Sequence, residues 1–254
     1  MLLAVDVGNT NIHMGIFDGE SLRATWRMAT DAHRMPDEYA GVMIPLFEAR
    51  SLTFKDIDEV VLVSSVPPLV TTFSELSRAY IGLDPFVIGA GIRTNMRILY
   101  DSPRDVGPDR IADAVAAFRL YGGPVIVVDL GTATVFDAIS KEGDYLGGAI
   151  APGIGIAADA LFERTSLLRR IELVAPKEAI GRNTTNAVQS GLVYGYVGLI
   201  EGVVARFQRE LGGGAKVVAT GGQARVIAKE APSVDVIEPN LTLMGLRILH
   251  ELNK

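Results

Sequence analysis

The chain makes the same short turn twice, and this repetition limits its possible folds more than any other feature. The first segment reads LLAVDVGNTN and the second reads VIVVDLGTAT. In each, an apolar run leads through Asp, a hydrophobic residue and Gly to hydroxyl or amide side chains. Asp6 and Asp129 stand about half a chain length apart. A strand that ends in an acidic glycine turn, once in each half, predicts two similar halves.

Both halves predict the same order of secondary structure. A set of three short apolar runs begins after residue 1, and a similar set begins after residue 124. With turn signals such as Asp18-Gly19, these runs predict three antiparallel strands in each half. Helical and strand patterns then alternate. We therefore expect an α/β chain of two domains related by internal duplication, residues 1–122 and 123–254, divided at Gly122-Gly123. A cleft between two such domains is a preferred place for a ligand.

The chemistry of the two turns points to a nucleotide. Glycine after a strand lets backbone N–H groups approach an anion, and Asn or Thr adds further donors. An Asp at the strand end disfavours a bare phosphate but can hold a cation or a water that the phosphate also contacts. This combination suits a metal–polyphosphate complex. The Gly-Gly of ATGG at 219–222 can admit a base or ribose against the backbone. Either turn alone also fits an ordinary loop.

Composition excludes several classes of protein. The net charge of −6 argues against a general nucleic-acid binder, whose affinity comes mostly from cationic contacts. The absence of cysteine excludes a thiolate metal site and suits a reducing cytosol. The apolar stretches 147–162 and 191–204 are short or interrupted, so we expect no membrane span. No basic leader precedes Asp6, and we expect a cytoplasmic location. No P-loop sequence is present.

Four motifs together resemble a known superfamily. The order DVGNTN at 6–11, GPDR at 107–110, VDLGTAT at 128–134 and ATGG at 219–222 is similar to the acetate kinase/sugar kinase/Hsp70/actin superfamily. Within this superfamily, the order and the sequences of the motifs resemble those of the type III pantothenate kinases, over nearly the whole chain. GPDR followed about 20 residues later by DLGT is the most specific part. The resemblance implies two ribonuclease-H-like (actin-like ATPase) domains.

The resemblance also implies an activity and its requirements. The expected reaction is ATP-dependent phosphorylation of pantothenate to 4'-phosphopantothenate, the first step of coenzyme A biosynthesis. The family uses Mg²⁺ with ATP and a monovalent cation, K⁺ or NH₄⁺, and works as a homodimer. The expected ligands are therefore ATP and pantothenate, with no nucleic acid and no membrane among the partners.

Site residues follow from the same resemblance, position by position. Asp109 matches the catalytic base, Asp129 the ligand of the monovalent cation, and Thr132 an ATP-binding residue. Arg110 suits the carboxylate of pantothenate, which a guanidinium can grip with two hydrogen bonds. The other substrate-binding matches are Tyr100, Gly107, Pro108 and Thr184, of which Thr184 can reach across a dimer interface. The first ATP-binding segment comprises Asp6, Val7, Gly8, Asn9, Thr10, Asn11, Ile12 and His13, with no chemical role assigned to His13.

Plainer interpretations of these positions stay open at this point. Pro108-Asp109 also fits a simple helix start, and Tyr100 a packing residue. Thr184 and Thr185 also fit a cap of the long helix that follows. Gly191, Gly195, Gly198 and Gly202 share one face of that helix, and each costs about 1 kcal/mol relative to alanine. Another backbone should pack there, either within the chain or from a second copy.

Three alternative functions compete with the pantothenate kinase interpretation. A kinase for another small alcohol is opposed by GPDR and by the short chain. A non-catalytic regulatory member, such as an accessory factor for transcription, is opposed by the presence of Asp6, Asp109, Asp129 and Thr132. An assembly protein like actin or Hsp70, which uses ATP as a switch, carries large insertions that this chain lacks.

Overall fold

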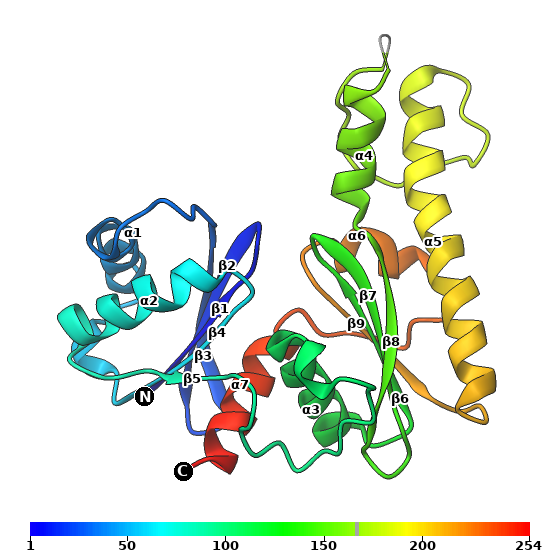
Figure 1. The fold of residues 1–254 in the computed structure, drawn as a ribbon. Helices are drawn as coiled ribbons and strands as arrows, with labels where there is room; N and C mark the ends of the chain where they lie inside the picture. The colour runs from blue at the N-terminus through cyan, green and yellow to red at the C-terminus, as the bar shows by residue number, and fades with distance from the viewer. Residues whose placement is uncertain (166–167) are drawn as a thin grey trace. The chain divides into compact units, whose positions relative to one another are not determined.

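The computed structural model describes residues 1–165 and 168–254, which form two compact units (Figure 1). Unit 1 comprises residues 1–95, 102–116 and 242–254. Unit 2 comprises residues 96–101 and 117–241. Each unit contains a five-stranded sheet.

The sheet of unit 1 has the strand order β3-β2-β1-β4-β5. The central strand β1 pairs antiparallel with β2 and parallel with β4. Antiparallel pairing continues to β3, and parallel pairing continues to β5. The strands are β1 (Leu2–Val7), β2 (Asn11–Asp18), β3 (Ser21–Ala29), β4 (Glu59–Ser64) and β5 (Phe86–Val87).

The sheet of unit 2 repeats this topology. Its order, β8-β7-β6-β9-β10, has antiparallel pairing on one side of β6 and parallel pairing on the other. The expected α/β fold with an internal duplication is therefore confirmed. The strands are β6 (Val125–Leu130), β7 (Ala133–Ile139), β8 (Tyr145–Pro152), β9 (Lys216–Thr220) and β10 (Val236–Ile237).

Helices follow the strands in the order that the sequence predicts. Those assigned to unit 1 are α1 (Pro36–Glu48), α2 (Pro67–Leu76), most of α3 (Pro108–Tyr121) and nearly all of α7 (Leu241–Leu252). Those of unit 2 are α4 (Ile154–Glu163), α5 (Thr184–Glu210) and α6 (Ala224–Ile227). Short helical turns are η1 (Phe54–Asp56), η2 (Ser77–Ile81), η3 (Pro103–Asp105) and η4 (Ala228–Glu230).

The compact units differ from the expected division between residues 122 and 123. Although α7 follows unit 2 in the chain, it packs in unit 1. Its buried leucines, Leu243, Leu246 and Leu249, recur at helical spacing and need an apolar partner. A Cβ atom placed on Gly15 of β2 would lie 2.8 Å from Leu243. The order of the predicted elements along the chain does not show that α7 packs in unit 1.

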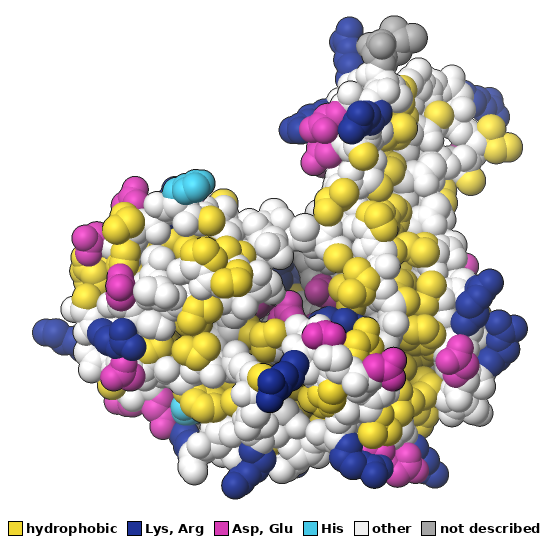
Figure 2. Space-filling view, in the orientation of Figure 1, with side chains coloured by type: hydrophobic (Ala, Val, Ile, Leu, Met, Phe, Trp, Pro, Cys, Tyr) yellow, Lys and Arg dark blue, Asp and Glu magenta, His cyan; other side chains and the backbone are white. Residues whose placement is uncertain are grey.

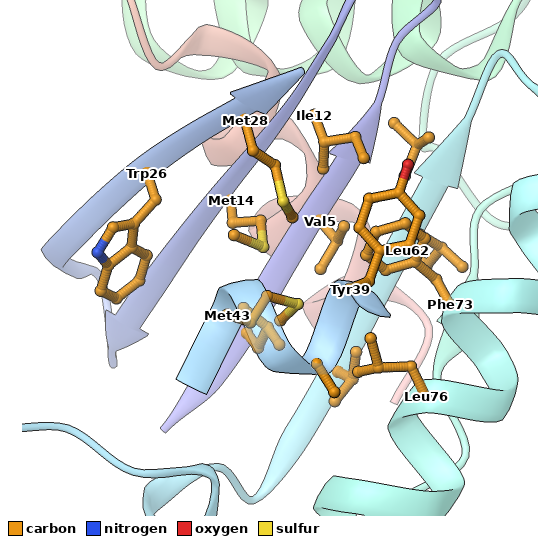
Figure 3. Packing of buried hydrophobic residues seen from close by; sticks show 14 of the residues in the cluster. Val5, Ile12, Met14, Trp26, Met28, Tyr39, Met43, Leu62, Phe73 and Leu76 are labelled. Carbon is orange, nitrogen blue, oxygen red and sulfur yellow. The ribbon is translucent and has the colours of Figure 1, made fainter. Parts of the chain in front are cut away.

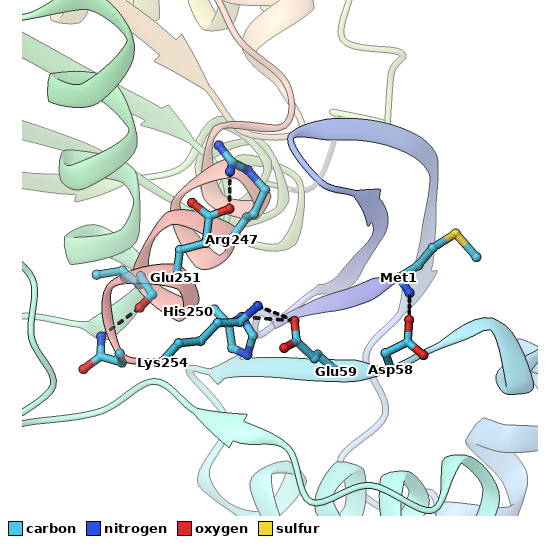
Figure 4. A network of polar contacts seen from close by, with 9 residues as sticks. Met1, Asp58, Glu59, Arg247, His250, Glu251 and Lys254 are labelled. Atoms are coloured by element: carbon cyan, nitrogen blue, oxygen red, sulfur yellow. Dashed lines mark hydrogen bonds and ion pairs between the residues drawn. The ribbon is translucent and has the colours of Figure 1, made fainter.

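Polar contacts also attach the end of α7 to unit 1 (Figure 4). Lys254 Nζ lies 2.8 Å from Glu59 Oε2, and His250 Nδ1 lies 3.8 Å from the same oxygen. Arg247 pairs with Glu251 on the helix itself at 2.7 Å. Glu59 begins β4, so these contacts connect α7 to the parallel side of the sheet.

The main core of unit 1 lies between the sheet and helices α1 and α2 (Figure 3). Val5, Ile12 and Met14 extend from the central strands toward Tyr39 and Met43 of α1. Trp26 stacks on Phe47 at 4.5 Å between ring centroids. Its indole N–H donates to the Leu46 carbonyl at 3.0 Å. The N-terminal strands are therefore held rigidly from one face.

Helix α5 is long and partly exposed. Within the described ranges, it alone is long and apolar enough to cross a membrane, and 33% of its most apolar window is buried. Core helices of soluble proteins meet the same criterion, and α5 packs on α4, α6 and β6. Figure 2 shows hydrophobic side chains along the visible side of α4 and α5.

We predict that Phe47→Ala lowers the free energy of unfolding by about 3–5 kcal/mol, because it removes a fully buried ring and its stacking partner for Trp26. Chemical denaturation followed by tryptophan fluorescence measures this loss. Ile44→Ala, on the exposed side of the same helix, serves as the control and should cost about 1 kcal/mol or less. Equal losses in the two variants would contradict the packing described here.

Candidate active site

The first glycine turn is closed by backbone hydrogen bonds. Gly8 N donates to Asn11 O at 3.0 Å, and Thr30 Oγ1 donates to Gly8 O at 2.6 Å. A Cβ on Gly8 would lie 3.0 Å from Asn11 O, so a larger residue would crowd the turn. The side chains of Asn9, Thr10 and Asn11 are exposed at its tip. They can therefore donate to an anion.

Two residues of segment 6–13, which the sequence predicts to bind ATP, have side chains buried in the core. Val7 and Ile12 are fully buried and belong to the cluster between the sheet and α1. Only their main-chain groups are available to a ligand. Their contribution to the segment is to fix the strands on either side of the turn.

His13 lies in a cross-strand row with two charged residues. It stands directly opposite Asp6 on β1 and Arg27 on β3, so the three side chains share one face of the sheet. Burial, together with the charge of Arg27, lowers the pKa of His13 from 6.5 to about 4. The imidazole is therefore neutral at pH 7 and supplies no positive charge to a phosphate.

The GPDR segment places a carboxylate beside the first glycine turn. Asp109 Oδ2 accepts a hydrogen bond from Ser65 Oγ at 2.9 Å, and Oδ1 accepts from Arg110 N at 2.9 Å. Ser65 N donates to Val7 O at 2.9 Å, directly before Gly8. A Cβ on Gly107 would lie 2.4 Å from Asp109 Oδ1, so glycine makes room for the carboxylate. Unit 1 thus joins residues 6–13 to residues 107–110.

The second glycine turn has a similar frame in unit 2. Gly131 N donates to Ala133 O at 3.0 Å, and Gly153 N donates to Thr132 O at 3.1 Å. The Thr132 side chain is exposed at the tip. Asp129 lies beside Gly221, where an added Cβ would stand 2.3 Å from Asp129 Oδ1. The ATGG motif and the second acidic turn therefore form one local structure.

The donor atoms around Asp129 suit a hard cation. A carboxylate and backbone carbonyls, such as Leu130 O near Gly221, are the oxygen ligands that alkali and alkaline-earth ions take. Glycine at position 221 leaves the room that this carboxylate occupies. Over residues 1–165 and 168–254, no group of three or more His, Cys, Asp or Glu could hold a metal ion.

Tyr100 is held against the edge strand β8. Leu99 N donates to Tyr145 O at 2.8 Å, and Tyr145 N donates to Arg97 O at 2.9 Å. The Tyr100 ring lies 6.4 Å from the Tyr145 ring, measured between centroids. It also faces Gly147, where an added Cβ would be in ordinary contact at 3.5 Å. Tyr100 remains 36% exposed, so packing within the chain leaves part of it available to a ligand.

Thr184 begins α5 but does not cap it. The cap is Asn183, whose Oδ1 accepts from Asn186 N at 2.9 Å. Thr184 lines an open groove of about 780 Å³ together with Ala157 and Leu161 of α4. Figure 1 shows that α5 begins at the end of the α4–α5 pair that lies away from the sheet of unit 2. The structure therefore does not bring Thr184 to the second glycine turn of its own unit.

Comparisons with known proteins agree with one another. The family model described as type III pantothenate kinase matches residues 2–206. A type III pantothenate kinase of Moorella thermoacetica is 53% identical over 253 residues, covering 100% of both chains. One from Roseiflexus sp. strain RS-1 is 48% identical over 254 residues, again covering 100% of both.

The chain belongs to the type III pantothenate kinase family.

Solved structures support the fold of this kinase. A structure described as a Baf family transcriptional activator from Campylobacter jejuni has a TM-score of 0.62 at 19% identity, covering 98% of this chain and 97% of that one. A polyphosphate/ATP-glucomannokinase from Arthrobacter has a TM-score of 0.52 at 17% identity, covering 100% and 99%. At these identities the likeness concerns the fold alone. It is the fold of actin-like ATPases and sugar kinases.

Ser65 and Gly221 were not named as site residues from the sequence. For Gly221, the ATGG motif drew attention to the segment but not to its contact with Asp129. For Ser65, the available signal is VSSVPP, in which two serines lie between a buried strand and a helix start. In this pantothenate kinase family member, pairing that strand with β1 would have placed Ser65 beside the glycine turn.

We predict that His13 makes the protein sensitive to mild acid. Between pH 6.5 and 4 the unfolded chain binds a proton at this residue that the folded chain excludes, so stability falls as pH drops through this window. The contribution is at most about 3 kcal/mol. Denaturation of His13→Gln at pH 7 and pH 4 should show a correspondingly smaller acid loss.

The exposed His33 provides the matched control. His33→Gln should retain the acid loss of the unchanged protein. If His13→Gln loses as much stability between pH 7 and pH 4 as His33→Gln, the burial of a neutral His13 is not the cause.

Proposed function

We propose that this kinase transfers the γ-phosphoryl group of ATP to pantothenate in the cytoplasm, forming 4'-phosphopantothenate in the first step of coenzyme A biosynthesis, with Asp109 as the catalytic base. Family membership supports the substrate pair. The observation that carries the assignment of the base is the Asp109 carboxylate, fixed by Ser65 and by the Arg110 amide next to the first glycine turn.

Asp109 has the chemistry that this reaction needs. Pantothenate attacks through a primary hydroxyl, whose proton must leave as the bond to phosphorus forms. A carboxylate can orient the hydroxyl and accept the proton. In a loose transition state, little of the hydroxyl proton needs to be removed early, so a strong base is not required. The neighbouring Arg110 can hold the carboxylate of pantothenate, and Tyr100 can pack on its apolar body.

The two glycine turns suit the phosphates of ATP. The Gly8 region offers exposed Asn9 and Thr10, and the second turn offers the exposed Thr132. Such donors stabilise charge on the phosphoryl oxygens. Asp6 would lie near the Mg²⁺ that accompanies ATP, and Asp129 would hold K⁺ or NH₄⁺. These cations, when bound, neutralise part of the charge on the phosphates.

A homodimer completes the proposal. Among residues 1–165 and 168–254, and leaving the helix's own backbone aside, nothing lies within 4 Å of a Cβ placed on Gly191, Gly195 or Gly198, and at Gly202 the Arg206 side chain of the same helix comes within 3.5 Å. Packing by the described residues therefore does not account for this glycine face. A second copy would cover it and would bring its own Thr184 toward the first copy. The exposed apolar side chains along α4 and α5 support the same interface (Figure 2).

None of the observations above specifically favours the alternative regulatory function. The structural neighbour described as a transcriptional activator is 19% identical, a likeness that concerns the fold alone.

We predict that Asp109→Asn lowers kcat for pantothenate-dependent ADP release by about 10²–10⁴-fold while ATP binding is retained. Turnover should require Mg²⁺ and should be faster in potassium or ammonium than in sodium. Asp105→Asn, an exposed carboxylate in the same segment, is the control and should keep full activity. ATP binding without stimulation by pantothenate would contradict the substrate, and an active Asp109→Asn would contradict the base.

We predict that Gly195→Leu converts the dimer to a monomer, because the added side chain would stand between the two helices. Light scattering coupled to gel filtration measures the mass. Glu210→Leu, at the exposed end of the same helix, should remain dimeric. A Gly195→Leu protein with the dimer's mass would exclude the glycine face from the interface.

A further inference from the structure

We propose that Ser65 is a positioning residue for the catalytic carboxylate, so that the rate of phosphoryl transfer depends on the Ser65 hydroxyl although it touches neither substrate. The inference rests on the proposed role of Asp109 as base. Its basis is the hydrogen bond from Ser65 Oγ to Asp109 Oδ2, at 2.9 Å, between residues far apart in the sequence.

Ser65 is itself held in place from both sides. Its backbone N–H donates to Val7 O at 2.9 Å, which continues the pairing of β4 with β1 by one residue. Ser64 Oγ accepts from Val66 N at 3.0 Å and donates to Val66 O at 2.9 Å, fixing the step into α2. Helix α2 then begins at Pro67. The Ser65 hydroxyl therefore extends from a rigid junction between a strand and a helix.

The hydrogen bonds to Asp109 fix the plane of its carboxylate. An isolated aspartate rotates freely about its last side-chain bond. Here Ser65 binds Oδ2 and the Arg110 amide binds Oδ1, so donors hold both oxygens. Each carboxylate oxygen can accept two hydrogen bonds, and one position on each remains for the substrate. A misaligned base costs rate rather than affinity, because orientation matters most as the proton moves.

The Ser65–Asp109 contact also fixes the distance from the Asp109 carboxylate to the first glycine turn. Ser65 N binds the carbonyl of Val7, and the next residue is Gly8 of the first glycine turn. The attacking hydroxyl must lie between the base and the phosphate that this turn is proposed to bind. One serine thus connects both groups, through its backbone to the turn and through its hydroxyl to the carboxylate.

The test compares three single variants in the full-length kinase. Ser65→Ala is expected to lower kcat about ten- to hundredfold, the usual effect of losing a hydrogen bond to a charged group. The KM values for ATP and pantothenate should stay within about twofold. Ser65→Thr, which keeps the hydroxyl, should restore most of kcat. Ser64→Ala, whose hydroxyl bonds only the backbone of Val66, is the matched control: it measures the effect of loosening the junction alone and should lower kcat clearly less than Ser65→Ala.

A double variant tests whether Ser65 acts through Asp109. In Asp109→Asn, whose residual turnover is measured at high enzyme concentration, Ser65→Ala should cause no further loss. An equal fractional loss in both backgrounds would overturn the inference, as would an unchanged kcat in Ser65→Ala. Equal effects of Ser64→Ala and Ser65→Ala would do the same, since they would indicate general damage to the junction.

These outcomes separate this inference from the proposed function. If Asp109→Asn loses turnover while Ser65→Ala keeps it, only the role of Ser65 falls. If Asp109→Asn keeps full turnover, Asp109 is not the base, and the inference falls with it.

Discussion

The parallel pairing of β1 with β4 is the constraint on which the candidate site depends. Its register sets Asp6 opposite Val63 and Val7 opposite Ser64, so the carboxyl ends of both strands lie at one edge of the sheet. Backbone hydrogen bonding leaves little freedom there, since buried N–H and C=O groups must find partners. The Gly8 turn, Ser65 and the carboxylate of Asp109 all take their positions from this edge.

The second sheet repeats the same frame for a different purpose. In unit 2, β6 pairs in parallel with β9, and Asp129 stands opposite Thr220. The residue that follows is Gly221 with a φ of +93°, and it leaves space against the Asp129 carboxylate. One edge therefore carries hydroxyl and carboxylate groups that hold each other. The other edge carries the Asp129 carboxylate beside Gly221, where no larger side chain would fit. Duplication supplied the backbone twice, and side chains at matching edges diverged.

Much of this could be predicted from the sequence, because local patterns determine it. Repeated apolar runs ending at Asp6 and Asp129 predict both strands and turns, and the resemblance to the family supplied the candidate site residues. What could not be predicted depends on long-range pairing. Ser65 and Asp109 are 44 positions apart, and no local pattern connects them. The cap of α5 by Asn183 rather than Thr184 likewise depends on backbone geometry that composition does not reveal.

The return of α7 to the first sheet affects how the chain folds during synthesis. All of unit 2 has been synthesised before Leu243, Leu246 and Leu249 are added to the chain. Until then the face of β2 around Gly15 lacks its cover, and apolar surface of the first-made sheet is open to wrong partners. The N-terminal half of the protein is therefore the last to be completed. A chaperone that meets the nascent chain would find its binding surface on the oldest part of the polypeptide.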